Sequence, residues 1–312
     1  MLNYLATNAN TSIQAQQVIT EELYQRYISF LDASPKTVAT YTRALKQFIN
    51  YLATQGINQP TRDDVIAYRE ALKADHKPST VQSYIVAVRL FFQWTEQEGL
   101  YPNIAEHVKG AKIQREHKKD YLTASQLKAI LANMDTDTPQ GRRNFAIFVL
   151  TVSCGLRTIE VARADIADLR TLGADTVLYL QGKGRQEKAD FVKIPPAVEK
   201  AIRATLADRE SKDGSQPLFI SLSNNSLGKR MTTRSISGAI KKAMQQAGYD
   251  SDRLTAHSLR HSAVTLALLN GQPLEEVQAF ARHSNINTTM IYSHAIDLAS
   301  NKCSNAVADA IL

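Results

Sequence analysis

The chain has 312 residues, 44% of them hydrophobic and 21% charged, and this length favours two domains over a single core. No apolar run approaches the roughly 20 residues that a membrane helix needs, and the first ten residues lack the pattern of a secretion signal, so we expect a cytoplasmic protein with no membrane partner. The net charge of +7 suggests a polyanionic partner, and it lies beyond residues 1–110, which carry ten basic and ten acidic side chains.

The first third of the chain has the helix-start and helix-end residues of a compact helical domain. Four helices are expected: residues 20–31, a segment from Pro35 to just before Gly56, residues 61–73, and a segment from Pro78 to Gly99. Apolar side chains recur at helical spacing in the second and fourth of these segments, which predicts buried faces. The helical domain is assigned to residues 1–111.

A short charged segment follows this domain. Residues 112–121 hold several basic side chains and few apolar ones, a composition typical of an exposed linker. The second domain is therefore assigned to residues 122–312, and it carries most of the positive charge.

The second domain begins with helices and contains one clear β element. Thr123 and Gln126 have the spacing of a capping box at a helix start, and residues 145–153 predict a mostly apolar second helix. Two apolar runs, 177–180 and 191–194, flank Gly182-Lys183-Gly184 and predict a β-hairpin.

Helical patterns then resume to the end of the chain. A helix is expected from Thr232 to Gln246, Pro273 can open another, and the tail from Asn305 to Leu312 is apolar at helical spacing. The expected fold is mainly α with a small β-hairpin or sheet, in two domains.

The sharpest local signal is the block His257-Ser-Leu-Arg260-His261. His257 and Arg260 are spaced i,i+3, so on a helix both could meet one phosphate. The block by itself also fits an ordinary polar helix start, and the two histidines have the i,i+4 spacing of a zinc pair. No glutamate adjoins them to act as a base, and the two cysteines, Cys154 and Cys303, stand far apart, so neither zinc nor a disulfide is favoured.

An arginine follows the apolar helix at 145–153. Gly155 permits a sharp turn before Arg157, and Glu160 follows three residues later. Arg157 could simply cap a helix or pair with Glu160. With Arg260 it could instead clamp a phosphate, because guanidinium groups form forked bonds with phosphate oxygens and stay charged.

Near the end of the chain a histidine precedes a tyrosine. His283 lies nine residues before Tyr292, and a short helical segment is expected between them, at residues 285–290. The chain has 12 tyrosines, most of which will be core or interface residues, so Tyr292 is not distinguished by itself.

Together these residues resemble the tyrosine recombinase family of phage integrases and Xer-type recombinases. The resemblance covers, in the family's order and with similar spacing, Gly155-Leu-Arg157-x-x-Glu160, Gly182-Lys183-Gly184, the block 257–261, His283 and Tyr292. It implies a helical core-binding domain at residues 1–111 and a catalytic domain after the linker. One departure is Arg282, which stands where a glycine commonly precedes the equivalent histidine.

The resemblance also implies roles for the matched residues. Tyr292 would attack the scissile phosphate and form a 3′-phosphotyrosyl link, while Arg157 and Arg260 would hold the non-bridging oxygens. Lys183 would protonate the departing 5′-oxygen. In the same scheme the proton acceptor for the phenol would be His257, the phosphate donor would be His283, and the residue that orients the site would be Glu160.

The implied activity is site-specific recombination through a Holliday junction, without a metal or a nucleotide cofactor. Its partners would be double-stranded DNA and three further copies of this chain, with or without accessory proteins, near the nucleoid. The purpose could be integration or excision of a mobile element, or Xer-type resolution. Two alternatives stay open: a type IB topoisomerase, disfavoured by the tail helix, and a catalytically silent DNA-binding regulator, disfavoured by the complete residue set.

Overall fold

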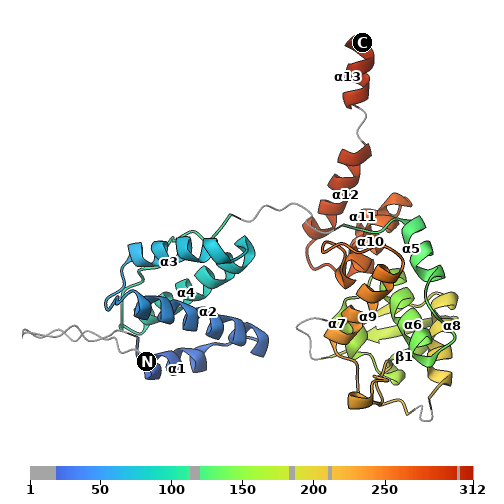
Figure 1. Ribbon diagram of the computed structural model, residues 1–312, viewed down its shortest axis with the longest axis horizontal. Helices are drawn as coiled ribbons and strands as arrows, with labels where there is room; N and C mark the ends of the chain where they lie inside the picture. Colours follow the sequence, from blue (N-terminus) through green and yellow to red (C-terminus); the bar gives the residue numbers. More distant parts are fainter. Residues whose placement is uncertain (1–18, 113–119, 183–186, 210–212, 301–302, 312) are drawn as a thin grey trace, which may run out of the picture. The chain divides into compact units, whose positions relative to one another are not determined.

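The computed structural model describes residues 19–112, 120–182, 187–209, 213–300 and 303–311. The chain forms two compact units, residues 1–116 and 117–312 (Figure 1). The division falls within the segment 112–121 that the composition marked as a linker. None of the helices in the described ranges is long and apolar enough to cross a membrane.

The first unit consists of helices that begin at the capping residues and prolines expected from the sequence. The helices are α1 (Glu21–Phe30), α2 (Pro35–Thr54), α3 (Arg62–Asp75) and α4 (Pro78–Gln97). The hydroxyl of Thr20 accepts a bond from Leu23 N (2.9 Å), and Pro35 occupies the first turn of α2 after Ser34. α4 packs against α2 and α3, and its aromatic rings fill the core, with Tyr27 and Phe91 in edge contact at 5.2 Å.

The second unit is also mainly helical. Its α-helices are α5 (Ala124–Ala132), α6 (Pro139–Ser153), α7 (Thr158–Arg163), α8 (Pro196–Ala207), α9 (Thr233–Gln246), α10 (Ala256–Leu269), α11 (Leu274–Ala281), α12 (Asn287–Ser300) and α13 (Cys303–Ile311). α5 begins with the predicted capping box: Thr123 N donates to Gln126 Oε1 (2.9 Å), and Gln126 N donates to the Thr123 hydroxyl (3.3 Å).

A three-stranded antiparallel sheet lies between the helices in sequence. Its strands are β1 (Leu169–Leu172), β2 (Asp175–Leu180) and β3 (Asp190–Lys193), in the order β1-β2-β3. The hairpin of β2 and β3 was predicted, and Tyr179 pairs with Phe191 in its register. β1 was not predicted, because its four side chains are exposed or half-buried and show no apolar alternation.

The end of the unit formed by α10, α11 and α12 carries most of the candidate site residues. These three helices pack on one another and lie together in Figure 1, and α10 also packs on α6. Our expectation of a short helix at residues 285–290 was wrong in extent, since α12 runs on to Ser300 and includes Tyr292. No glycine or proline follows Met290 to stop it. The predicted tail helix is present as α13.

Candidate functional site

The site begins at the turn that follows α6. Gly155 has a φ of +56°, and a Cβ built there would lie 2.9 Å from a ring carbon of Phe280. Only glycine satisfies both the backbone conformation and the close approach. The turn places Arg157 at the N-cap of the short helix α7.

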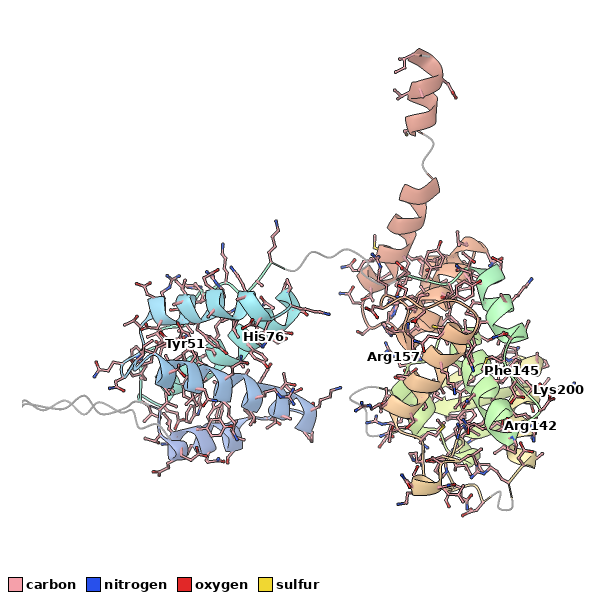
Figure 2. All side chains as sticks on the ribbon, in the orientation of Figure 1. Tyr51, His76, Arg142, Phe145, Arg157 and Lys200 are labelled. Atoms are coloured by element: carbon pink, nitrogen blue, oxygen red, sulfur yellow. The ribbon has the colours of Figure 1, made fainter. Side chains whose placement is uncertain are left out.

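Arg157 donates two hydrogen bonds to the Glu160 carboxylate. Its backbone N donates to Glu160 Oε2 (2.7 Å), and its guanidinium Nη1 donates to Oε1 (2.9 Å). The Arg157 side chain is 28% exposed, whereas that of Glu160 is 1% exposed. The predicted pairing of these residues therefore holds the guanidinium group at the surface above a buried carboxylate (Arg157 is labelled in Figure 2).

Glu160 is ionised despite its burial. Burial by itself would raise the pKa of the Glu160 carboxyl, but Arg282 and then Arg157 outweigh it and hold that pKa below its ordinary value. The second arginine was not anticipated: Arg282 Nη2 lies 3.0 Å from Glu160 Oε2.

Arg260 lies on α10 and faces the turn at Gly155. It is 1% exposed, and its guanidinium group donates to the carbonyl oxygen of Gly155 (2.6 Å) and to that of Ala281. Burial, followed by repulsion from Arg157 and Arg282, lowers the pKa of Arg260 to about 9, so it remains a cation at neutral pH. Arg260 thus connects the start of α7 with the end of α11.

His283 follows a residue in an unusual backbone conformation. Arg282 ends α11 in the left-handed region (φ 53°, ψ 47°), the conformation that a glycine adopts readily. His283 Nδ1 then lies 2.9 Å from the hydroxyl of Thr289. Burial, together with Arg260, Arg157 and Arg282, lowers the pKa of His283 to about 4, so its imidazole is neutral near pH 7. When Thr289 donates to Nδ1, Nε2 carries the proton and can donate to an anion.

Tyr292 is buried on α12, packed against Val264, Val277 and Ala281. Its hydroxyl forms a short hydrogen bond with His261 Nδ1. Burial raises the pKa of Tyr292 to about 12, and Arg260 and Arg157 offset this only in part. The phenol is therefore protonated at neutral pH and needs a proton acceptor before it can act as a nucleophile.

The imidazole that contacts the Tyr292 hydroxyl belongs to His261, which was not among the predicted site residues. His257, the residue expected to accept the proton, lies one turn earlier on α10, and its ring meets that of His261 edge to face with centroids 4.5 Å apart. Position in the sequence gave no reason to prefer His261, because the choice depends on which face of α10 meets α12. In the described ranges, no three His, Cys, Asp or Glu side chains gather as metal ligands would.

The remaining predicted residue, Lys183, lies outside the described residues. His257 contacts His261, and the other predicted residues, Arg157, Glu160, Arg260, His283 and Tyr292, form one cluster, with the rings of His283 and Tyr292 stacked at 6.4 Å. Cationic guanidinium groups, the neutral imidazole of His283 and a phenol in one cluster can bind a phosphate and attack it.

Comparison with known proteins identifies the family of the chain. The model of the phage integrase family matches residues 120–298, more than half of the chain. The chain belongs to the phage integrase family. The model of the N-terminal SAM-like domain of phage integrases matches residues 22–99, so both units correspond to domains of this family.

Relatives with curated names are tyrosine recombinases. XerC of Haemophilus ducreyi is 30% identical over 279 residues, which cover 86% of this chain and 88% of that protein. A tyrosine recombinase of Synechocystis sp. is 28% identical over 277 residues, which cover 83% of this chain and 86% of that protein. The resemblance drawn from the motifs is confirmed.

Solved structures share the fold. The XerH recombinase in a post-cleavage complex with a palindromic difH substrate has a TM-score of 0.72 and 19% identity, covering 91% of this chain and 84% of that one. A λ integrase dimer bound to a COC′ core site has a TM-score of 0.67 and 16% identity, with coverage of 86% and 96%. The predicted fold class, a helical core-binding domain followed by a recombinase catalytic domain, is confirmed.

Proposed function

We propose that this phage integrase family member cleaves and rejoins double-stranded DNA, with Tyr292 as the nucleophile. The observation that carries the proposal is the convergence of Tyr292, Arg157, Arg260 and His283, which come from α12, α7, α10 and the loop before α12, on one cluster. A phenol beside a group of cations is the arrangement that attack on a phosphodiester requires.

In the proposed reaction, Tyr292 Oη forms a bond to phosphorus, and the bond from phosphorus to the 5′-oxygen breaks. The phenolic proton passes to an imidazole, and the 5′-oxygen receives a proton from Lys183 and leaves as a hydroxyl. The product is a 3′-phosphotyrosyl link that retains the energy of the phosphodiester. Rejoining is the same sequence in reverse, so no nucleotide cofactor is consumed.

The arginines supply the charge that the transition state needs. Arg157 is partly exposed and can meet a non-bridging oxygen, and Arg260 lies beside it with further N–H groups beyond the two bonded to carbonyls. Loss of one such donor typically lowers a rate by about 10²- to 10³-fold. His283 would add a bond from Nε2.

The proposed assembly is a homotetramer that exchanges strands between two duplexes through a Holliday junction. α13 exposes Val307 (59%) and Ile311 (75%), which are spaced i,i+4 and form an apolar edge. An open groove of about 600 Å³ between α5, α6, α10 and α11 is lined with apolar side chains such as Leu131 and Phe280. We infer that α13 of one copy occupies this groove in a neighbouring copy.

The proposed biological role is integration or excision of a mobile element, or Xer-type resolution, in the cytoplasm at the nucleoid. Accessory proteins could assist either process. Sequencing the DNA that becomes attached to the protein would decide between these roles, since mobile-element ends and a chromosomal resolution site are different sequences.

The proposal is tested by trapping the covalent intermediate. Nicked fragments of the source genome are incubated with the protein, and DNA that remains attached after denaturation is recovered. Tyr292→Phe should abolish the adduct and leave DNA binding almost unchanged, because only one hydroxyl is lost. Tyr249→Phe, which removes a tyrosine hydroxyl at a half-buried position of the same unit, is the control and should retain the adduct. An absent adduct, or one that persists in Tyr292→Phe, overturns the assignment.

A further inference from the structure

Arg282 is held in a backbone conformation that costs energy, and its guanidinium group makes several contacts inside the protein. A side chain at a φ of 53° is disfavoured by roughly 1–2 kcal/mol relative to the right-handed region. Arg282 is nevertheless 11% exposed, so the guanidinium group lies inside the protein rather than in water.

The guanidinium group of Arg282 crosses from the end of α11 to the turn before α7. Nη1 donates to the carbonyl oxygen of Phe280 (2.8 Å), and Nη2 donates both to the carbonyl oxygen of Gly155 and to Glu160 Oε2, each at 3.0 Å. In return, the backbone carbonyl of Arg282 accepts a bond from Arg157 Nη2 (3.4 Å). One residue therefore holds both members of the Arg157–Glu160 pair.

These contacts change the net charge of the site. Arg157 and Glu160 by themselves would form a neutral pair, because one guanidinium group meets one carboxylate. Arg282 adds a second cation to the same carboxylate, and Arg260 adds a third within the cluster. Three cations against one carboxylate leave two net positive charges. The phosphodiester and the phenolate that attacks it are both negative, so this excess of positive charge stabilises the attack.

We propose that Arg282 is a positioning residue of the DNA-cleavage site, which neutralises the buried Glu160 and so leaves the charge of Arg157 available to the scissile phosphate. This inference rests on the proposed function. It assigns to Arg282 a role that a glycine at this position could not perform, since glycine adopts the same backbone conformation but carries no charge.

The test is a double-mutant cycle in single-turnover DNA cleavage. Arg282→Gln removes the charge and keeps a polar chain, and the rate should fall on the order of 10²-fold while DNA affinity changes less. Glu160→Gln in the Arg282→Gln background removes the carboxylate that Arg157 then faces by itself, so part of the rate should return. The proposal would be overturned if the rate losses of Arg282→Gln and Glu160→Gln simply add in the double variant, or if Arg282→Gln loses no rate.

Two further variants separate charge from backbone and folding effects. Arg282→Lys keeps the cation but loses the fork, and its rate should lie between those of the unaltered chain and Arg282→Gln. Arg282→Gly relieves the backbone cost, so it should fold well and still cleave slowly. A glycine variant that cleaves at the rate of the unaltered chain contradicts the proposal.

A measurement without DNA keeps the inference distinct from the proposed activity. The positive field of Arg282 helps to depress the pKa of His283, so an NMR titration of His283 should show a higher pKa in both Arg282→Gln and Arg282→Gly than in the unaltered chain. An unchanged pKa counts against the charge argument even if cleavage is slowed. A missing covalent adduct in the unaltered chain, with this pKa difference present, counts against the proposed function and leaves the placement of Arg282 supported.

Discussion

At the scale of single residues, burial and neighbouring charge decide which protons the site can move. Tyr292 holds its proton because burial outweighs the attraction of Arg260 and Arg157, and its pKa is about 12. Burial and the same cations drive the proton from His283, with a pKa of about 4. The Tyr292 phenol and the His283 imidazole are therefore both neutral near pH 7, and the proposed reaction must begin with a proton transfer from the phenol.

His261 should be the acceptor of that proton, because its Nδ1 contacts the Tyr292 hydroxyl. His261→Ala should lower the single-turnover cleavage rate near pH 7 by about 10²-fold or more. The rate of this variant should keep rising at alkaline pH, where hydroxide takes the proton, whereas that of the unaltered chain should level off once the imidazole is neutral. His257→Ala is the matched comparison, and an alkaline rise in that variant instead would restore the assignment made from the sequence.

His283 should make folding stability depend on pH in a defined window. Its pKa is about 4 in the folded chain and 6.5 without perturbation, so between these values the unfolded chain binds more protons. The stabilisation is complete above the higher value and is lost as the pH falls toward the lower one. The depressed pKa of Glu160 acts mainly below its ordinary value of 4.5, so it overlaps only the acidic edge of this window, below about pH 5.

His283→Gln keeps a polar partner for Thr289 but cannot be protonated in this range. Its free energy of unfolding, from urea denaturation at about pH 7 and about pH 5, should fall less than that of the unaltered chain. Equal losses in the two proteins would show that His283 does not carry this dependence.

At the scale of elements, two turns and one helix–helix contact place the site residues. The turn at Gly155 aims Arg157, the left-handed end of α11 aims His283, and the packing of α12 on α10 brings Tyr292 to His261. Arg260 and Arg282 join the first two turns by donating to the same carbonyl oxygen, that of Gly155. A change in one turn should therefore disturb both arginines.

Gly155→Ala should destabilise the chain more than Gly173→Ala does. Both glycines have positive φ, +56° and +60°, so each alanine incurs a backbone cost of roughly 1–2 kcal/mol. Only the Cβ at Gly155 also meets the Phe280 ring, at 2.9 Å, whereas nothing lies within 4 Å of the one at Gly173. The extra crowding should add about 1–3 kcal/mol in denaturant unfolding. Equal effects of the two substitutions would mean that the ring moves aside.

At the scale of the whole molecule, surface chemistry indicates two kinds of partner. The excess positive charge beyond residue 110 suits a polyanion, and binding to DNA through it should weaken as salt increases. The apolar edge of α13 and the groove of the second unit suit a second copy of the chain. The proposed function needs both partners together.

Replacing Val307 and Ile311 with aspartate should impair assembly without impairing the active site. Both side chains are exposed, so thermal stability and cleavage at a single site should change little. Holliday-junction formation should fall strongly, because the aspartates cannot be buried in an apolar groove. Asp309→Ala, at an exposed polar position on the same helix, is the control. Junction formation that survives the double substitution would exclude α13 as the link between copies.

Much of the fold and of the site was predictable because the signals are local. Helix starts at Thr20, Pro35 and Thr123 depend on neighbouring residues only. The i,i+3 spacing of His257 and Arg260 gives them a common face once the segment is helical, as it is in α10. The family followed from the order of the motifs. The full length of α12 was missed, although no glycine or proline ends the helix at Met290. Strand β1 was missed because its residues show no apolar alternation.

By itself, the sequence determined the family, the helical architecture and the candidate residues of the site, because each depends on residue type and spacing along the chain. Only the tertiary structure decided that His261 contacts the Tyr292 hydroxyl and that Arg282 joins the pair Arg157–Glu160. Those contacts join α10 to α12 and the end of α11 to the turn before α7. They depend on how helices distant in sequence pack, and on which buried charged and polar groups this packing brings into contact.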